Sequence, residues 1–434
     1  MIKMVKSGEF KKNHIVRKTI GNSDINTSVA EIIKGVAERG DEALREYTKK
    51  FDGCEPESFE LNKADIDKAV AGVEPEFIKV MENAALNIED FHRNQIRKGF
   101  DLPPKNGVIL GQKITPIERV GIYIPGGTAP YPSSVLMNCI PAKLAGVSEI
   151  IITTPPSGDD RGANVNGVDT GLLAAAKIAG VDRVFSIGGA QAVAALAFGT
   201  ESVPRVDKIT GPGNAYVAEA KRQVFGIVGI ESIAGPSDIL VIADENADPV
   251  LIAADMLSQC EHGPDSPALL LTADIELARK VREEIEEQLS HLPRKDTVRR
   301  AVDEHGLIII TKSTDEAFEI SNIIAPEHLE IMLDEPFNHL DKVKNAGSVF
   351  LGKHTPEPLG DYYAGPNHTL PTSGTARFSS PLSVDDFIKK TSYTYYSENA
   401  LNDIGDDVIH FAEKEGFKAH ALTVIKRIKK GNRI

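Results

Sequence analysis

Hydrophobic residues along this chain follow two different periods. Near the N-terminus they recur at helical spacing, which predicts helices over residues 26–51 and 63–92. From residue 108 onward, short apolar runs alternate with helical patterns, and glycine-rich turns separate them. A strand followed by a glycine turn and a helix, repeated at this spacing, indicates a parallel sheet built from βαβ units.

The βαβ pattern occurs in two series, so we expect an α/β protein with two Rossmann-like parallel sheets. The first series predicts strands at residues 120–124, 149–153, 183–187 and 208–210. The second series predicts strands at residues 239–243, 268–272 and 306–311, with helices at 249–260 and 275–292 between them. Neither series carries the G-x-G-x-x-G fingerprint, because Tyr216 stands at the third glycine position after Gly211 and Gly213.

Composition narrows the class of protein. The length of 434 residues suits two or three domains, and the formal net charge of -14 disfavours binding to nucleic acid or to anionic membranes. There is no signal peptide and no apolar run near the ~18 residues that span a bilayer, so we expect a cytoplasmic protein. Three cysteines (Cys54, Cys139 and Cys260) make no disulfide framework and fit a reducing compartment.

The helix predicted at residues 249–260 ends in a candidate metal-binding pair. Gln259 and His262 are three residues apart, so they share a helix face whose apolar stripe turns polar in its last turn. The alternative is a histidine placed at a helix C-terminus for its interaction with the helix dipole. Cys260 is rotated by about 100° from Gln259 and falls on the apolar stripe, so we expect it to be a buried structural residue.

Two further segments carry groups suited to acid–base chemistry. Glu327 and His328 are adjacent and differ in pKa, which suits the handling of two different protons, although Pro326 could simply begin an exposed helix. The polar stretch 360–369 is either a functional loop or a long turn. The C-terminal helical region from residue 375 has too little apolar content to fold alone, so we expect it to pack on another surface, such as a partner subunit.

Together these segments resemble the histidinol dehydrogenase family over nearly the whole chain. The resemblance runs from Arg39-Gly-Asp-Glu-Ala-Leu-Arg to Lys418-Ala-His420-Ala, and its most specific stretches are Val120-Gly-Ile-Tyr-Ile-Pro-Gly-Gly127, Ser186-Ile-Gly-Gly-Ala-Gln191, Gly211-Pro-Gly-Asn214, Ala234-Gly-Pro-Ser237, Ser258-Gln-Cys-Glu-His-Gly-Pro-Asp265, Pro326-Glu-His-Leu329, Asn367-His-Thr-Leu-Pro371 and Gly374-Thr-Ala-Arg-Phe378. Their joint order and spacing carry the resemblance. Cys260 stands where the family usually has Ala.

The resemblance implies a role for each candidate residue. The family's zinc ligands match Gln259, His262, Asp361 and His420. Its proton-handling pair matches Glu327 and His328. Contacts to the substrate L-histidinol match Ser237, Gln259, His262, His328, Asp361, His368, Glu415 and His420. Contacts to NAD⁺ match Tyr123, Gln191 and Asn214.

The resemblance also implies a domain organisation and a reaction. Residues 22–122 and 236–374 would form a first α/β domain with most of the zinc site, and residues 123–235 a second one that binds NAD⁺. Residues 1–21 and 375–434 would be small, mainly helical extensions that pack on the partner subunit of a homodimer with shared active sites. The implied reaction is the zinc-dependent oxidation of L-histidinol to L-histidine through L-histidinal, with two NAD⁺.

Three alternatives remain open on the sequence alone. A relative on the same scaffold would oxidise another polar alcohol with NAD⁺. A zinc hydrolase would use the same metal and the same Glu-His pair to activate water. A binding protein without catalysis is least favoured, because many reactive groups coincide.

Overall fold

The computed structural model describes residues 1–11, 23–54, 56–126, 130–156 and 164–428. Three expectations fall at least partly outside these residues: residues 12–21 of the N-terminal extension, the end of the first glycine turn at Gly127, and the last residues of the C-terminal region.

The chain divides into two compact units, which we describe separately. The larger unit comprises Met1–Gln95 and Ile117–Phe387. The smaller unit comprises Ile96–Pro116 and Ile388–Ile434. No helix among the described residues is long and apolar enough to cross a membrane.

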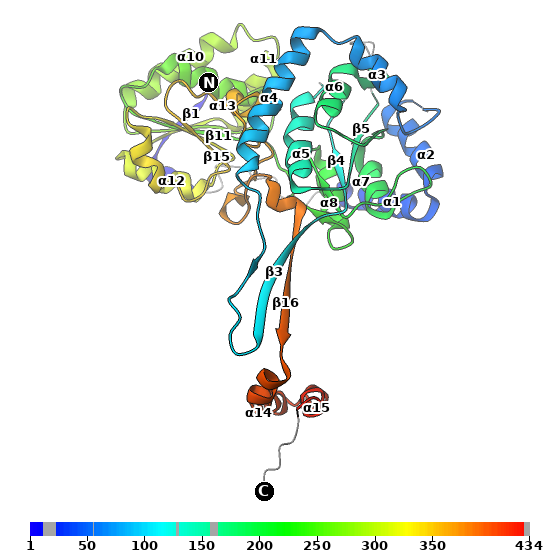
Figure 1. Cartoon of the computed structure of the whole chain (residues 1–434). Coiled ribbons are helices and arrows are strands. Elements are labelled where there is room, and N and C mark those ends of the chain that lie inside the picture. The colour runs from blue at the N-terminus through cyan, green and yellow to red at the C-terminus, as the bar shows by residue number, and fades with distance from the viewer. Residues whose placement is uncertain (12–22, 55, 127–129, 157–163, 429–434) are drawn as a thin grey trace. The chain divides into compact units, whose positions relative to one another are not determined.

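The larger unit contains two parallel sheets, each with helices on both faces (Figure 1). The first sheet has six strands in the spatial order β1 (Lys3–Lys6), β13 (Leu307–Ile310), β12 (Ala268–Thr272), β11 (Ile239–Ala243), β14 (His328–Met332) and β15 (Ser348–Leu351). Its central strands are continuous apolar runs that are buried on both faces, as a covered parallel sheet requires. Its helices are α9 (Pro249–Cys260), α10 (Ile275–Leu289), α11 (Lys295–His305), α12 (Thr314–Ile324) and α13 (Glu357–Tyr362).

The second sheet has five parallel strands. In spatial order they are β10 (Gly229–Ile230), β9 (Lys208–Thr210), β4 (Arg119–Tyr123), β5 (Glu149–Thr154) and β8 (Arg183–Ser186). One face is covered by α3 (Lys63–Ala71), α4 (Pro75–Arg93), α5 (Pro132–Ala145) and α6 (Thr170–Ile178). The other is covered by α1 (Ser23–Arg39), α2 (Asp41–Asp52), α7 (Gly189–Phe198) and α8 (Ala215–Val224).

Short elements complete the larger unit. A hairpin is formed by β6 (Asn164–Val165) and β7 (Val168–Asp169). The described 3-10 helices are η1 (Ser7–Glu9), η3 (Pro336–Lys342), η4 (Thr375–Arg377) and η5 (Val384–Phe387).

The expected α/β class with two parallel sheets is confirmed, but the domain assignment needs two corrections. Helices α1 to α4 pack on the second sheet and not on the first, because their buried faces join its core; Val29 and Val36, for example, share a cluster with Phe185. The N-terminus is also not an extension over its first residues, since β1 pairs along its whole length with β13 at the edge of the first sheet.

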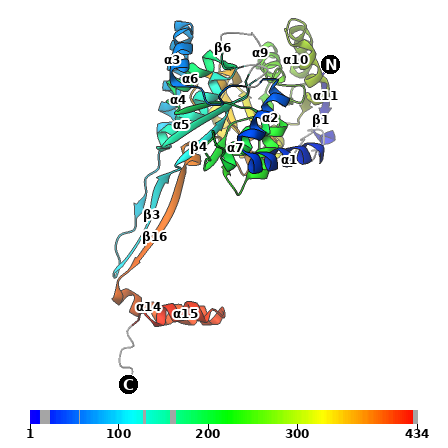
Figure 2. The same ribbon diagram turned by 90° about the vertical axis from the view of Figure 1, so that its right-hand side faces the viewer.

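The smaller unit is an antiparallel ribbon followed by a helical hairpin (Figure 2). Its elements are β2 (Phe100–Asp101), β3 (Val108–Pro116), β16 (Ile388–Tyr396), α14 (Glu398–Lys414) and α15 (Lys418–Ile425). The expected C-terminal helices are therefore present, but they follow a nine-residue strand that pairs with β3.

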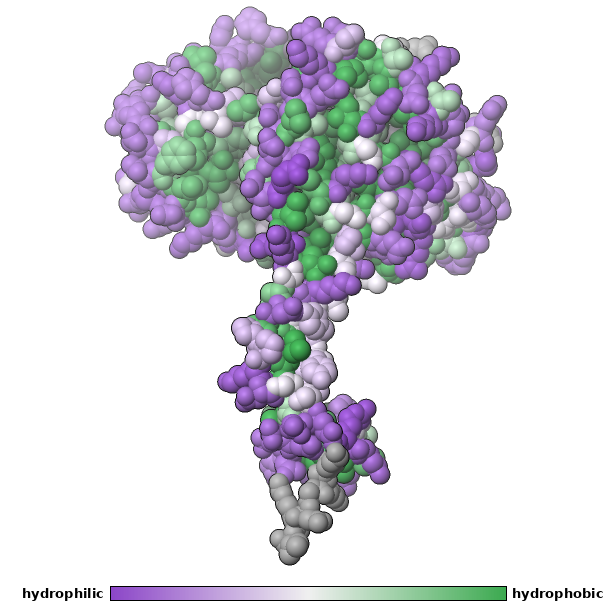
Figure 3. Space-filling model, in the orientation of Figure 1, coloured by the Kyte–Doolittle hydropathy of each residue, from purple (hydrophilic) through white to green (hydrophobic). Residues whose placement is uncertain are grey.

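Little of the smaller unit's helical hairpin is buried within the chain. In α14 only Ala400 and Gly405 are buried, and in α15 only Ala421. Large apolar side chains stay exposed, including Phe411 at 68% and Phe417 at 53%, and apolar surface also continues along the ribbon (Figure 3). A core this small agrees with the expectation that this region needs further packing.

Candidate active site and metal centre

Glu327 and His328, the expected proton-handling pair, lie at the amino edge of the first sheet. His328 is the first residue of β14, and it stands beside Ile239, the first residue of β11. Ligands of open α/β sheets more often bind at the carboxyl ends of strands. The alternative of an exposed helix that begins at Pro326 is wrong: α12 ends at Ile324, Ala325 adopts a left-handed conformation, and the chain then enters β14 directly.

Asp238 and Glu327 lock each other in place at this edge. The Glu327 backbone N–H donates to Asp238 Oδ1 at 2.8 Å, and the Asp238 N–H donates to Glu327 Oε2 at 3.1 Å. Burial raises the pKa of Glu327 well above its usual range, and the charge of Asp238 adds to this effect. Once ionised, such a carboxylate is a stronger base than an exposed one.

The tautomer of His328 follows from its backbone contact. Nδ1 lies 2.9 Å from the carbonyl oxygen of Asp238, which can only accept, so Nδ1 carries the proton. Nε2 then has a free lone pair, and it faces Glu357 Oε1 at 3.6 Å. Burial lowers the pKa of His328 to about 4, so the imidazole is neutral at pH 7 and able to accept a proton.

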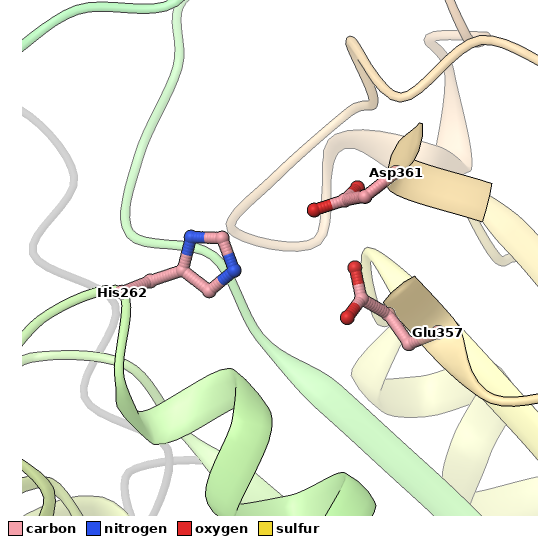
Figure 4. Close-up of side chains that lie close together, drawn as sticks. All are labelled: His262, Glu357 and Asp361. Atoms are coloured by element: carbon pink, nitrogen blue, oxygen red, sulfur yellow. The ribbon is translucent and has the colours of Figure 1, made fainter. Parts of the chain in front are cut away.

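His262, Glu357 and Asp361 form a cluster suited to a metal ion. One ligand atom from each lies within 4.8 Å of the others, and the three side chains converge from two parts of the chain (Figure 4). His262 follows the end of α9, whereas Glu357 and Asp361 are four residues apart on α13 and so share a face. Imidazole and carboxylate donors suit zinc, manganese and cobalt.

The side chain of Gln259 also fits a metal site. It lies in the last turn of α9 and is fully buried, yet neither its amide oxygen nor its amide nitrogen has a hydrogen-bond partner. An unpaired buried amide costs about 1–3 kcal/mol. The backbone N–H of His262 donates to the backbone carbonyl oxygen of Gln259 at 3.2 Å, so the two residues are adjacent in space. A bound cation would satisfy the orphaned amide oxygen.

Glu357 is a site residue that the sequence analysis missed. Its side chain is 1% exposed, and burial together with the charge of Asp361 raises its pKa to about 9. The signal in the sequence was its spacing of four residues from Asp361, which is common between helical carboxylates and carries no specificity.

Two buried carboxyl groups, Glu330 and Asp255, lie next to Glu357 of the candidate metal site. Glu330 on β14 accepts the backbone N–H of Glu357 at 2.9 Å, which fixes the start of α13. Glu330 is also hydrogen-bonded to the buried Asp255 on α9. Burial and the charge of Asp255 raise the pKa of Glu330, and burial raises that of Asp255 to about 6.

We expect Asp255→Asn to stabilise the fold at neutral pH by about 1–3 kcal/mol. The folded protein holds a proton on Asp255 more tightly than the unfolded chain, so stability falls as pH rises from about 4 to about 6. Asn has no proton to lose and keeps a hydrogen bond to Glu330. Urea unfolding at several pH values measures the difference, which should vanish below pH 4.

The exposed Asp341, replaced by Asn, serves as the surface control for this prediction. Equal stability of parent and Asp255→Asn proteins across the whole pH range would contradict the expectation.

His368 connects the metal cluster to the second sheet. Its Nδ1 donates to the carbonyl oxygen of Asp361 at 2.9 Å, and its Nε2 lies 3.2 Å from the hydroxyl of Ser134 on α5. Both ring nitrogens are thus engaged. Ser237 is half-buried directly before Asp238 and β11. The substrate contacts expected of His368 and Ser237 stay predictions.

The three expected NAD⁺ contacts meet at the carboxyl edge of the second sheet. Tyr123 ends β4, Gln191 lies in the first turn of α7, and Asn214 caps α8 by accepting the N–H groups of Tyr216 and Val217. The order of the strands reverses between β4 and β9, and such switch points are where dinucleotides bind in these sheets.

Tyr123 and Gln191 each have a partner within the chain. The Tyr123 hydroxyl accepts the backbone N–H of Gly189 at 3.1 Å, and its side chain is buried. The Gln191 amide donates to Asp52 at 3.4 Å. Burial raises the pKa of Asp52 to about 6.

Glu415 and His420 belong to the smaller unit. Glu415 follows α14, and His420 lies on α15 with its ring 5.1 Å from that of Phe417. Both residues are exposed. Their expected roles toward zinc and substrate stay predictions.

The expected bounds of α9 and the burial of Cys260 are confirmed, but His262 lies beyond the helix, two residues after Cys260, so it does not share a helix face with Gln259. Asp248 caps the helix by accepting the N–H of Val250, Pro249 occupies its first turn, and the helix ends at Cys260. Cys260 is fully buried, and burial raises its pKa to about 12, so it is a core residue and not a reactive thiol.

Comparison with known proteins gives a consistent result. The family model for histidinol dehydrogenase matches residues 15–428. The histidinol dehydrogenase of Clostridium acetobutylicum is 52% identical over 408 residues, which cover 94% of this chain and 93% of that protein. The enzyme of Bacillus cereus is 54% identical over 400 residues, which are 92% of each chain.

The fold agrees with an experimental structure as well. The crystal structure of histidinol dehydrogenase from Elizabethkingia anophelis matches this one with a TM-score of 0.91 at 39% identity, over 98% of both chains. The sequence matches and the structural match both cover nearly the full length, so the chain belongs to the histidinol dehydrogenase family.

Proposed function

We propose that this protein carries out the zinc-dependent, four-electron oxidation of L-histidinol to L-histidine through L-histidinal, with two NAD⁺. Family membership makes the chain an oxidoreductase that acts on histidinol in histidine biosynthesis. The observation that best supports the finer proposal is the arrangement at one sheet edge. The buried Glu327–His328 pair lies there, with the His262–Glu357–Asp361 cluster facing His328.

His328 is suited to act as the base in both oxidations. Its Nε2 accepts the proton of the alcohol hydroxyl while the hydride leaves the same carbon, which yields the aldehyde. After Nε2 has released that proton to solvent and the aldehyde has been hydrated, Nε2 accepts a proton from the hydrate while the second hydride leaves, which yields the carboxylic acid. Its hydrogen bond to the Asp238 carbonyl keeps the ring in one orientation for both steps.

Glu327 is suited to the hydration step. Its ionised carboxylate accepts a proton from the water that attacks the aldehyde carbon. Two N–H···O bonds with Asp238 fix the main chain and the side chain of Glu327 next to His328. In this scheme His328 accepts the protons of the substrate's hydroxyl groups, and Glu327 accepts the proton of the attacking water.

Gln259, His262 and Asp361 would hold zinc, with Glu357 beside them, and His420 would complete the ligand set. Zinc, when bound, supplies a fixed positive centre that orients the amine and imidazole nitrogens of histidinol. Tyr123, Gln191 and Asn214, at the carboxyl edge of the second sheet, would hold NAD⁺, which would supply the hydride acceptor for each oxidation.

We further propose a cytoplasmic homodimer with shared active sites. The exposed apolar side chains of α14 and α15 support an interface there, because they are too many for the unit's own small core. Glu415 and His420 lie on this surface and would reach the partner's site.

The test of the function is a spectrophotometric assay of NAD⁺ reduction with histidinol and with a panel of other polar alcohols. We expect histidinol to be the best substrate and to give two NADH per histidine formed. A better substrate in the panel would favour a different dehydrogenase on the same scaffold. No NAD⁺ reduction, together with hydrolytic activity, would favour a zinc hydrolase.

A further inference from the structure

A buried ion pair lies beneath the turn between β9 and α8. Lys221 projects from α8, Glu231 directly follows β10, and their Nζ and Oε1 atoms are 2.6 Å apart. The exposed fractions of the two side chains are 1% and 5%. A pair this deep loses the hydration of both charges, which the attraction between them only partly offsets.

Both members of this ion pair bind the same backbone residue. The Gly211 N–H donates to Glu231 Oε1 at 2.9 Å, and the Gly211 carbonyl accepts from Lys221 Nζ at 3.0 Å. The pair therefore holds the two polar groups of Gly211 at once. Charge-assisted hydrogen bonds of this kind are stronger than those between neutral groups.

Position 211 requires glycine for both conformational and steric reasons. Its φ is +111°, and a Cβ there would lie 2.0 Å from the carbonyl oxygen of Tyr123. The turn is thus pressed against the end of β4, at the switch point of the second sheet. Three residues later, Asn214 caps the ten-residue helix α8.

We propose that Lys221 and Glu231 are positioning residues for the dinucleotide. They hold the turn 211–214 so that Asn214 and the first N–H groups of α8 stand in fixed geometry toward NAD⁺. This inference rests on the proposed function, which places NAD⁺ at this edge. A buried ion pair is by itself a weak source of stability, whereas these two side chains fix both polar groups of Gly211, so we assign them a role in the geometry of the turn.

The test is the double variant Lys221→Met/Glu231→Leu in the zinc-loaded, full-length protein. Calorimetry measures the Kd for NAD⁺, and steady-state kinetics measure the KM for histidinol. We expect the Kd for NAD⁺ to rise about tenfold or more, with the histidinol KM and zinc content near those of the parent, while the melting temperature falls because the buried polar groups of Gly211 lose these partners. A merely structural role would shift both substrates together.

A matched control comes from the same helix. Glu219 and Arg222 form an ion pair on α8, with Arg222 Nη2 and Glu219 Oε1 2.5 Å apart, and Glu219 also accepts a hydrogen bond from Gln223 on the same helix. The variant Glu219→Leu/Arg222→Met should leave the Kd for NAD⁺ unchanged.

The outcomes separate this inference from the proposed function. If the double variant folds and binds NAD⁺ as tightly as the parent, the inference is overturned. If it fails to fold, Glu231→Gln decides: it keeps an oxygen near Gly211 but removes the charge, and an unchanged Kd for NAD⁺ would overturn the inference. A parent protein that does not bind NAD⁺ would overturn the proposed function first.

Discussion

Replacing His328 by Asn is expected to slow both oxidation steps by about 10²–10⁴-fold. Asn can keep a hydrogen bond to the Asp238 carbonyl, but it has no lone pair that can accept a proton at the position of Nε2. Both steps need that proton acceptor. The measurement is NADH formation from histidinol and, separately, from added histidinal.

Glu327→Gln provides the comparison. Its side-chain oxygen can still accept the Asp238 N–H, so the packing of this edge is kept, while the base for water is lost. We expect histidinal oxidation to slow much more than the first step. Zinc content and melting temperature should match the parent in both variants. Equal losses in both steps for both variants would contradict a division of roles between Glu327 and His328.

Mixing two inactive variants is expected to restore activity if the active sites are shared. A His420→Asn subunit supplies an intact Glu327, and a Glu327→Gln subunit supplies an intact His420. Half of randomly mixed dimers contain one subunit of each kind, and each of these holds one complete site. The mixture should therefore reach roughly one quarter of the parent's rate.

The control mixes Glu327→Gln with His262→Asn. Both residues lie in the larger unit, so no mixed dimer would contain a site in which both are intact. This mixture should stay inactive. If the first mixture also stays inactive after verified subunit exchange, each site is built within one chain.

Local signals made part of both sheets and the helix α9 predictable. Apolar runs marked β4, β5, β8 and β9 of the second sheet and β11, β12 and β13 of the first, and the apolar stripe that turns polar at Gln259 marked α9. The burial of Cys260 followed from its angle on the helix. Each of these inferences depends on residues that are close together in sequence.

Features set by distant contacts were not predictable in this way. The spacing of apolar residues in α1 and α4 predicts a helix but not which of the two sheets it packs against. The strand β1 is too short to be recognised from its sequence pattern. The partner of Glu327 and His328 was not predicted for the same reason. Asp238 meets Glu327 only because β11 and β14 are neighbours, although β12 and β13 lie between them in the chain.

The residues of the candidate metal site were also only partly predictable from local sequence. Gln259 and His262 alone were compatible with an ordinary helix end, and their spacing gave no indication of Asp361. The family resemblance supplied that partner, and the structure brings His262 and Asp361 together. It adds Glu357, and it leaves the Gln259 amide buried without a partner.

The most direct test of this account is zinc removal from the purified protein, followed by titration with zinc while histidinol oxidation is measured. We expect the metal-free protein to be inactive, and activity to return in proportion to zinc until one ion per subunit is bound. Gln259→Ala should weaken zinc binding in a chelator competition, because it removes the buried amide. Full activity in a protein verified to be free of metal would contradict the account.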